Sequence, residues 1–336
     1  PEDGGDSGNG DAGGAFDGAN GAGLPAFGNG GGGVMTQPAP PQQQVEYSRR
    51  NPFPSKVIEN ICLNGSRSAK ETQHIELSLE GSGLTYEPGD ALGLVPQNCP
   101  EVVDDILKVT GFRGTEPVGA IDGADIPLRR ALTEVYDVTG LSQPLVEKYA
   151  ERAQLTRLDD LLDNSENLKE YMYGRELFDL LRDFPIRGLS AEELISLLRK
   201  LPPRLYSIAS SPKAHPGEVH LTIGAVRYNT HGRERKGVAS TYVADRIEVG
   251  DVIPVYIHAN KNFKMPADGD VPMIMVGPGT GVAPFRAFVE EREATGATGK
   301  NWLFFGDQHM TEDFLYQLEW QEHLSKGALD RLDVAF

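Results

Sequence analysis

The sequence predicts an antiparallel β-barrel with a helical insert, followed by an incomplete, doubly wound α/β unit. Short segments that alternate apolar and polar residues lie on both sides of a helical stretch of roughly one hundred residues. After residue 270 the pattern changes to strand, helix, strand, helix, strand, which is half of a doubly wound parallel sheet. A length of 336 residues leaves room for about two domains, so both units fit in one chain.

Residues 1–50 are predicted to be a linker rather than part of either unit. They are rich in Gly, Asp, Asn, Ala and Pro, and they contain a short Gln run at 42–44. Because this composition buries too little apolar surface to offset its chain entropy, we expect a disordered, acidic linker.

The barrel is predicted over residues 51–267, with the helical insert at about 100–200. Turn residues such as Glu87-Pro88-Gly89-Asp90 separate its strands. The six predicted strands are Val57–Leu63, His74–Leu79, Ala91–Val95, Leu205–Ala209, Val219–Tyr228 and Val252–His258. The insert is too long to be a loop, so we expect a lobe that positions other parts of the molecule.

The α/β unit is predicted over residues 268–336. Its expected elements are strand Pro272–Val276, helix Val282–Arg292, strand Trp302–Phe305, helix Phe314–Leu324 and strand Leu332–Phe336. Ligands of such sheets bind just beyond the carboxyl ends of the strands. We therefore expect the chain to be a fragment, in which this unit is incomplete at its C-terminus.

Composition excludes several classes of protein. A net charge of −17 argues against nucleic acid as a partner, and it fits either a solvated surface or docking to a basic protein. No apolar run is long enough to span a bilayer, and the N-terminus has no secretory pattern. Cys62 and Cys99 form no C-x-x-C pair, and the histidines show no metal-ligand spacing. We expect a cytoplasmic protein with reduced thiols and no metal or membrane partner.

Three short motifs carry the predicted chemistry. Gly277–Gly281 is a glycine turn between a strand and a helix, which can aim backbone N–H groups at a phosphate but can also be only a tight connection. Gly237-Val238-Ala239-Ser240 is a second such turn, which Ser240 can cap. Arg204–Ser211 offers a cation for a pyrophosphate, a tyrosine for a flat ring, and serines for hydrogen bonds, although a surface Arg and a core Tyr would give the same pattern.

The order of these motifs resembles the ferredoxin–NADP reductase superfamily. The matching patterns are Arg204-x-Tyr206-Ser207, Gly237-Val238-x-Ser240 and Gly277-Pro278-Gly279-Thr280-Gly281-x-Ala283-Pro284-Phe285-Arg286. The helical insert narrows the resemblance to the diflavin reductases. Further segments resemble the flavoprotein (alpha) subunits of bacterial NADPH–sulfite reductases, namely Lys70–Thr72, Leu84–Asp90, His220–Tyr228 and Phe304–His309.

The resemblance implies FAD and NADPH as cofactors and assigns residues to them. Arg204, Leu205, Tyr206 and Ser207 would hold FAD, with Arg204 on the pyrophosphate, Tyr206 stacked on the isoalloxazine ring, and Ser207 near N5 as the catalytic residue. Thr222, Ile223, Gly224 and Tyr228 would line the adenylate side, and Gly237, Val238, Ala239 and Ser240 would wrap the pyrophosphate. Ser142 and Gly174 would add FAD contacts, while Gly279 and Thr280 would face the nicotinamide.

The resemblance also implies a function. NADPH would reduce FAD, and electrons would pass through a flavodoxin-like FMN domain, absent from this chain, to a sirohaem and iron–sulfur sulfite reductase beta subunit. The segment that reads the 2′-phosphate of NADPH would lie beyond Phe336. Two alternatives stay open: a diflavin reductase for nitrate reductase or a haem monooxygenase, and a flavin-binding fragment that does not oxidise NADPH.

Overall fold

The computed structural model describes residues 46–119 and 123–336. The predicted linker over residues 1–50 falls outside this part of the chain, except for residues 46–50. Both cysteines lie within it as free thiols, Cys62 exposed and Cys99 buried. In the described residues, no helix is both long and apolar enough to cross a membrane.

The predicted barrel is a six-stranded antiparallel sheet with the strand order β6-β3-β10-β1-β2-β7. Each of the six predicted strands corresponds to one of its members: β1 (Phe53–Cys62), β2 (Thr72–Ser78), β3 (Ala91–Leu94), β6 (Arg204–Ser207), β7 (Glu218–Gly224) and β10 (Val252–His258). β1 pairs with β10 over Phe53 to Lys56 and with β2 from Val57 onward, and a bulge between Val57 and Glu59 interrupts the pairing with β2 near its start. A bulge bends its strand, so β1 can turn the sheet over its apolar core.

The two edges of this sheet approach each other without forming a continuous closed barrel. In the described residues, β6 and β7 meet at one isolated bridge between Ile208 and Leu221. The N–H of Ala209 also donates to the carbonyl of His220 at 2.8 Å. The predicted antiparallel β unit is thus confirmed, as a sheet that curls toward a barrel.

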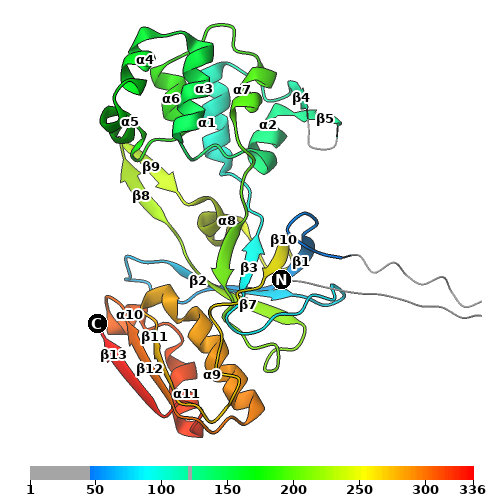
Figure 1. Cartoon of the computed structure of the whole chain (residues 1–336), viewed down its shortest axis with the longest axis vertical. Helices are drawn as coiled ribbons and strands as arrows, with labels where there is room; N and C mark the ends of the chain where they lie inside the picture. The colour runs from blue at the N-terminus through cyan, green and yellow to red at the C-terminus, as the bar shows by residue number, and fades with distance from the viewer. Residues whose placement is uncertain (1–45, 120–122) are drawn as a thin grey trace, which may run out of the picture. The chain divides into compact units, whose positions relative to one another are not determined.

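The insert between β3 and β6 is helical, as expected, and packs around an apolar core of its own. Figure 1 shows its helices gathered together at the top of the view. Its helices are α1 (Pro100–Thr110), α2 (Leu128–Arg130), the short π-helix η1 (Ala131–Val135), α3 (Gln143–Ala153), α4 (Thr156–Leu162), α5 (Ser165–Met172), α6 (Leu177–Asp183) and α7 (Ala191–Leu197). A short hairpin of β4 (Pro117–Gly119) and β5 (Asp125–Pro127) lies between α1 and α2.

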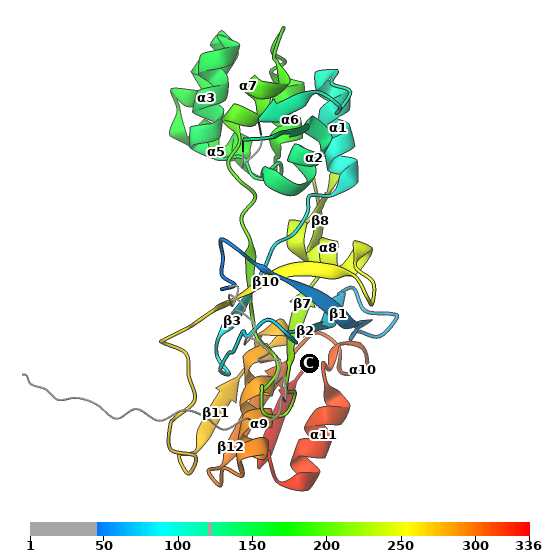
Figure 2. The ribbon, with the colours of Figure 1, turned by 90° about the vertical axis from the view of Figure 1, so that its right-hand side faces the viewer.

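One predicted strand is wrong in extent. Val219–Tyr228 is not continuous, because β7 ends at Gly224 and a new strand, β8 (Arg227–Thr230), pairs with β9 (Arg233–Lys236) in a separate hairpin. The break falls at Val226, whose carbonyl accepts from the Gly237 N–H just before α8 (Val238–Arg246) and whose N–H donates to the hydroxyl of Ser240 in the first turn of that helix. Figure 2 shows β8 between the helices of the insert and α8.

The C-terminal unit is a parallel sheet with the order β11-β12-β13, as the doubly wound pattern predicts. Its elements are β11 (Met273–Val276), the 3-10 turn η2 (Gly279–Val282), α9 (Ala283–Thr295), β12 (Asn301–Gly306), α10 (Met310–Asp313), α11 (Gln317–Lys326) and β13 (Arg331–Ala335). The predicted helix Phe314–Leu324 begins later than expected, because Tyr316 takes a left-handed backbone angle of φ +58° just before α11.

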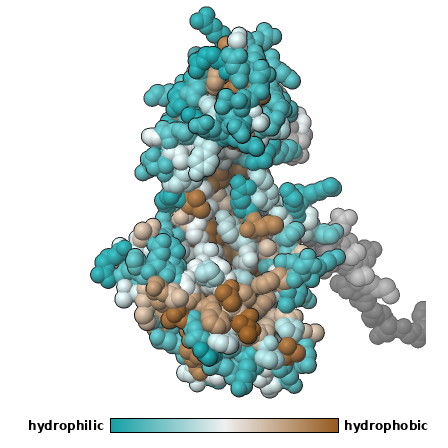
Figure 3. Space-filling view, turned by 60° about the vertical axis from the view of Figure 1, so that its left-hand side comes forward, coloured by the Kyte–Doolittle hydropathy of each residue, from teal (hydrophilic) through white to brown (hydrophobic). Residues whose placement is uncertain are grey.

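The two faces of the parallel sheet differ. Met275, Leu303 and Phe305 are buried in a core with residues of α9 and α11. On the other face, Ile274 and Val276 are 67% and 64% exposed. Figure 3 shows apolar residues gathered in the lower part of the view, at the height where Figure 1 places this sheet.

The predicted boundary near residue 267 between the two units stays a prediction.

Candidate functional site

A cavity of about 880 Å³ brings together residues of the antiparallel sheet and the glycine turn of the parallel unit. Five predicted site residues line it: Tyr206, Thr222, Gly224, Gly279 and Thr280. Its volume is in the range that holds a small-molecule or cofactor ring. The motifs predicted to bind flavin and nicotinamide therefore share one cavity wall.

The strand β6 places Tyr206 in this cavity. β6 pairs with β3, with Tyr206 opposite Leu92 and Arg204 opposite Leu94. Tyr206 is half-buried, and burial raises the pKa of its phenol to about 12, so the ring stays neutral at physiological pH. A neutral, partly buried aromatic ring is suited to stacking on a flat ligand.

The neighbours of Tyr206 point elsewhere. Leu205 and Ser207 are exposed, and Arg204 is half-buried beside Tyr206. None of these three residues lines the 880 Å³ cavity. Alternation along a strand puts Leu205 and Ser207 on the opposite face from Tyr206. Their roles toward FAD stay predictions.

The strand β7 contributes Thr222 and Gly224 to the cavity. Thr222 is 5% exposed, and a Cβ on Gly224 would lie 3.4 Å from Cγ2 of Thr280. This short approach puts β7 directly against the turn that follows β11. The side chain of Ile223 is fully buried in the sheet core, so only its backbone can face a ligand.

The turn before α8 is attached to the cavity through Val226. The N–H of Gly237 donates to the carbonyl of Val226 at 2.8 Å, and the Ser240 hydroxyl accepts from the Val226 N–H at 3.1 Å. Ser240 does not cap α8 as predicted, because Gly237 is the N-cap residue and has no side chain. Val238, Ala239 and Ser240 are all buried, so a ligand here would contact mainly their backbone.

Three predicted residues lie apart from the main cavity. Tyr228 is 48% exposed on β8. Gly174, with φ +67°, touches Thr230 of the same strand, whose hydroxyl donates to the Gly174 carbonyl at 2.6 Å. Ser142 begins α3 and lines a separate cavity of about 330 Å³ within the insert. The structure brings Gly174 to the hairpin that carries Tyr228, but it leaves Ser142 in a cavity of its own.

The site prediction missed several residues that line the main cavity. Lys70 and Asp307 form an ion pair across it, and Gly279 lies near the same carboxylate, since a Cβ there would be 3.5 Å from Asp307 Oδ2. Asp307 directly follows β12, and the rule that ligands bind beyond the carboxyl ends of parallel strands could have found it. The other missed lining residues are Ala69, Glu71, Thr72, Ala225, Val226, Pro278, Gly306, Gln308 and Ala335.

A buried polar seam joins the two sheets beside the cavity. Arg286 of α9 is 5% exposed, and it donates to the carbonyl of Ala209 at 2.7 Å just beyond β6. Its charge is balanced by Glu290 at 2.9 Å and Glu319 at 2.6 Å. The hydroxyl of Tyr316 lies 2.6 Å from Thr222 Oγ1. The seam therefore ties the helix after the glycine turn to both β6 and β7.

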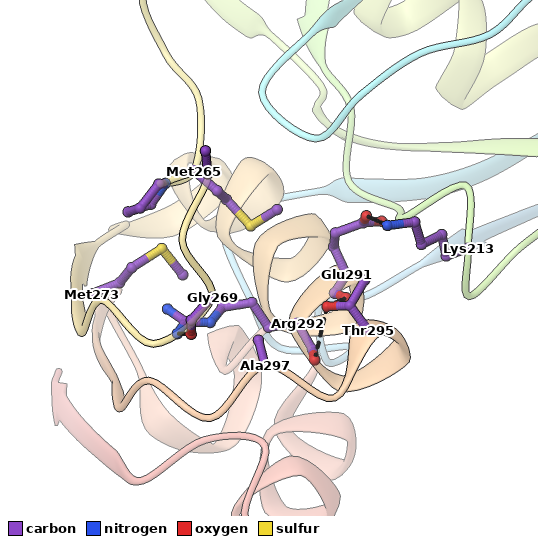
Figure 4. Close-up of a pocket in the computed structure, with 10 residues that line it drawn as sticks. Lys213, Met265, Gly269, Met273, Glu291, Arg292, Thr295 and Ala297 are labelled. Carbon is purple, nitrogen blue, oxygen red and sulfur yellow. Dashed lines mark hydrogen bonds and ion pairs between the residues drawn. The ribbon is translucent and has the colours of Figure 1, made fainter.

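A second cavity, of about 340 Å³, lies next to the loop that precedes β11 (Figure 4). Arg292 and Lys213 are its cationic side chains, but both have partners already. Arg292 donates to the carbonyls of Gly269 and Val271, and Lys213 pairs with Glu291 at 2.7 Å. These contacts hold the loop in place, which makes the larger cavity the better candidate site.

The residues of the larger cavity fit a flavin and a nicotinamide nucleotide. Gly279 has φ +53°, an angle that glycine adopts without strain, and the turn leads through η2 into α9, so a helix start lies beside the cavity. Gly237 begins α8 and is joined to the cavity lining through its hydrogen bond to Val226. An aromatic ring, a glycine turn and a helix start around one cavity are typical of an oxidoreductase that binds nucleotide cofactors.

Comparison with known proteins agrees with this class. Residues 45–242 match the model of the FAD binding domain, and residues 275–334 match that of the oxidoreductase NAD-binding domain. The chain therefore belongs to the FAD-binding domain family, with an oxidoreductase NAD-binding domain following, and the predicted resemblance is confirmed.

Two similar proteins carry the same name. The chain is 56% identical over 315 residues to the sulfite reductase (NADPH) flavoprotein alpha-component of Bacillus subtilis (strain 168). The aligned residues cover 91% of this chain and 52% of the relative. It is 46% identical over 291 residues to the protein of that name from Aliivibrio fischeri (strain ATCC 700601 / ES114), covering 87% and 48%. The chain thus spans about half the length of the curated relatives that it matches.

Proposed function

We propose that this chain is the FAD- and NADPH-binding part of a flavoprotein reductase that supplies electrons for the reduction of sulfite to sulfide. One observation carries the proposal: Tyr206 and Thr222 of the flavin motifs line the same cavity as Gly279 and Thr280 of the nicotinamide turn. Hydride transfer needs the two rings in contact, and a shared wall is what that contact requires.

FAD, when bound, would supply the step from hydride transfer to single-electron transfer. The chain's own residues would hold and orient it. Tyr206 would stack on the ring, Arg204 would bind the pyrophosphate, and Ser207 would donate a hydrogen bond near N5. The backbone of Gly237–Ser240 would wrap the pyrophosphate at the start of α8.

The remaining predicted contacts belong to the same proposal. Thr222, Ile223, Gly224 and Tyr228 would contact the flavin nucleotide from β7 and β8, with Ile223 using its backbone. Gly174 and Ser142 would add contacts from the insert, and Gly279 and Thr280 would face the nicotinamide.

The names of the relatives support a wider setting for this chain. We propose that electrons leave FAD through an FMN domain and reach a sirohaem-containing sulfite reductase beta subunit, in the cytoplasm. The relatives are about twice as long as the chain, which leaves room for further domains in a protein of this kind.

Anaerobic stopped-flow mixing tests the proposal. The purified chain, loaded with FAD, is mixed with NADPH, and the flavin absorbance is followed. We expect bleaching of the flavin by NADPH. A flavin that stays oxidised would support the alternative of a flavin-binding fragment without NADPH oxidation.

Two substitutions test the assigned residues. Tyr206→Ala and Arg204→Ala are expected to strip FAD absorbance from the protein, because each removes a main contact to the cofactor. Tyr206→Phe keeps the stacking ring and should retain FAD. Arg157→Ala, on the helix α4 of the insert, is the matched control for the lost charge. Full yellow colour in Arg204→Ala and Tyr206→Ala would refute the assignment.

A further inference from the structure

Four polar side chains form a hydrogen-bonded series that leads from the cavity wall to the surface. Thr222 Oγ1 lies 2.6 Å from the hydroxyl of Tyr316, and that hydroxyl lies 3.0 Å from His74 Nδ1. His74 Nε2 lies 3.1 Å from Glu76 Oε1. All three distances are within the range of real hydrogen bonds. The series joins three elements that are far apart in sequence: β7, the turn before α11, and β2.

Three members of this series are buried, and the fourth, Glu76, is partly exposed. Thr222, His74 and Tyr316 are 5%, 5% and 7% exposed. Thr222 lines the 880 Å³ cavity, and the side chain of Glu76 is 20% exposed. Hydrogen bonds therefore connect Thr222, through Tyr316 and His74, to a carboxylate that water can reach.

The donors and acceptors can all point the same way. Thr222 O–H donates to the Tyr316 oxygen, Tyr316 O–H donates to His74 Nδ1, and His74 Nε2–H donates to the Glu76 carboxylate. This order requires a neutral imidazole with its proton on Nε2. Burial, and next the positive charge of Arg286, lower the pKa of His74 to about 4, so the ring is neutral at physiological pH.

The backbone at Tyr316 is held in a costly conformation to make these contacts. Tyr316 takes φ +58°, in the left-handed region that is unfavourable for a residue with a Cβ. Residues keep such angles where the surroundings over-determine them, often at functional sites. The Arg286 guanidinium lies 5.0 Å from the centre of the Tyr316 ring and helps to fix it.

We infer that Thr222, Tyr316, His74 and Glu76 form a proton relay between the flavin cavity and solvent. The inference rests on the proposed function. Oxidation of NADPH yields NADP⁺, two electrons and one proton; the electrons leave to the acceptor, and the proton must reach water. Each member of the relay takes one proton from the cavity side and gives one on the surface side, so none changes its charge after the proton has passed.

The relay matters when the mouth of the cavity is covered. A nicotinamide nucleotide at Gly279 and Thr280 would occupy the cavity that Thr222 also lines, and it would displace water from this cavity. The buried route through Tyr316 would remain open. General acid–base groups of this kind change rates by roughly 10²–10⁴-fold.

Proton release from the FAD-loaded chain tests the relay. FAD that has been photochemically reduced to its anionic hydroquinone, FADH⁻, is mixed with two equivalents of ferricyanide in the presence of a redox-inactive NADPH analogue and a pH-indicator dye; each FADH⁻ gives up two electrons and one proton. In Tyr316→Phe we expect proton release at least about tenfold slower than in the wild type, with normal FAD content. Release at the wild-type rate in Tyr316→Phe would overturn the inference.

Matched variants separate the relay from a general loss of packing. Tyr149→Phe removes another buried hydroxyl, one that donates to the Phe184 carbonyl at 2.7 Å within the insert, and should release protons at the wild-type rate. Thr222→Val should release protons slowly, and Thr222→Ser should release them near the wild-type rate, since the relay needs only the hydroxyl. Equal rates of proton release in Thr222→Val and Thr222→Ser would contradict the relay, even if Tyr316→Phe does not fold.

A readout without cofactor distinguishes failure of the relay from failure of the proposed function. Nitrogen-15 NMR of the histidine rings in the chain without FAD should show His74 neutral, with the proton on Nε2. A proton on Nδ1, or a doubly protonated ring at neutral pH, would overturn the proposed order of donors. A wild-type chain that takes up no FAD would instead contradict the proposed function.

Discussion

The two glycine turns of this chain, before α8 and before α9, differ in how they are built into the structure. At α8, Gly237 sits between Val226 and Ser240, and the next three residues are buried. At α9, Thr280 and Gly281 are exposed, and Gly279 takes φ +53°. The first turn is a fixed part of the sheet edge, whereas the second presents its tip to the cavity. This difference fits the proposed roles of the two turns, in which the first would be a fixed cradle for FAD and the second would contact NADPH.

The largest effect of a glycine substitution is expected at the base of the second turn. A Cβ on Gly277 would lie 2.7 Å from Phe285 Cδ2, 2.8 Å from the Gly281 carbonyl oxygen and 2.9 Å from Val282 Cα. Two of these atoms belong to the backbone and cannot move away cheaply. Gly277→Ala should lower the free energy of unfolding by about 2–3 kcal/mol, measured by urea denaturation. A loss below about 0.5 kcal/mol would show that the turn is looser than its contacts indicate.

A smaller loss is expected at the first turn. A Cβ on Gly237 would lie 2.6 Å from the Ser240 hydroxyl oxygen and 2.9 Å from Val226 Cβ. Both are side-chain atoms, so Gly237→Ala should cost about 1–2 kcal/mol of stability. The same change should weaken FAD binding, because the displaced Ser240 and Val226 hold the cradle. Unchanged FAD affinity in Gly237→Ala would remove the distinction between the two turns.

Backbone conformation alone should decide the effect at Gly279. Its nearest obstacle to a Cβ is Asp307 Oδ2 at 3.5 Å, an ordinary contact, but its φ of +53° is strained for any other residue. Gly279→Ala should cost about 1 kcal/mol and raise the Kd for NADP⁺, with little change for FAD. Thermal unfolding and nucleotide titration check the two parts. A larger effect on FAD than on NADP⁺ would contradict the assignment of this turn.

The smallest effect is expected at Gly281. A Cβ there would meet only Pro278 Cδ at 3.7 Å, and its φ is not positive. Gly281→Ala should leave stability unchanged or raise it by up to about 1 kcal/mol, because alanine restricts the unfolded chain. This variant is the matched control for the other three glycines. A marked destabilisation would mean that the exposed tip has a structural role.

The sequence predicted those strands and helix starts whose structure depends on neighbouring residues. The strands β2 and β10 and the glycine turn before α9 were found because a strand or a helix start leaves a pattern in neighbouring residues. The end of β7 was missed, since Val226 bonds to Gly237 and Ser240, more than ten residues away. Capping by Ser240 was wrong for the same reason, because its hydroxyl is used by Val226.

The polar seam and the relay could not be predicted from local pattern. His74, Thr222 and Tyr316 come from three separate elements and meet only when the two sheets pack together. In the sequence each of them is an ordinary polar or aromatic residue. The cavity pair of Lys70 and Asp307 is similar, although the position of Asp307 after a parallel strand was a usable signal.

Crossed titration of the two turns tests the central claim most directly. FAD and NADP⁺ affinities are measured for the wild type, Gly237→Ala and Gly279→Ala by absorbance and calorimetry, with Gly281→Ala as control. The account predicts that Gly237→Ala weakens FAD binding by about tenfold or more while Gly279→Ala leaves it near the wild-type value and weakens NADP⁺. Loss of FAD in Gly279→Ala with full retention in Gly237→Ala would contradict it.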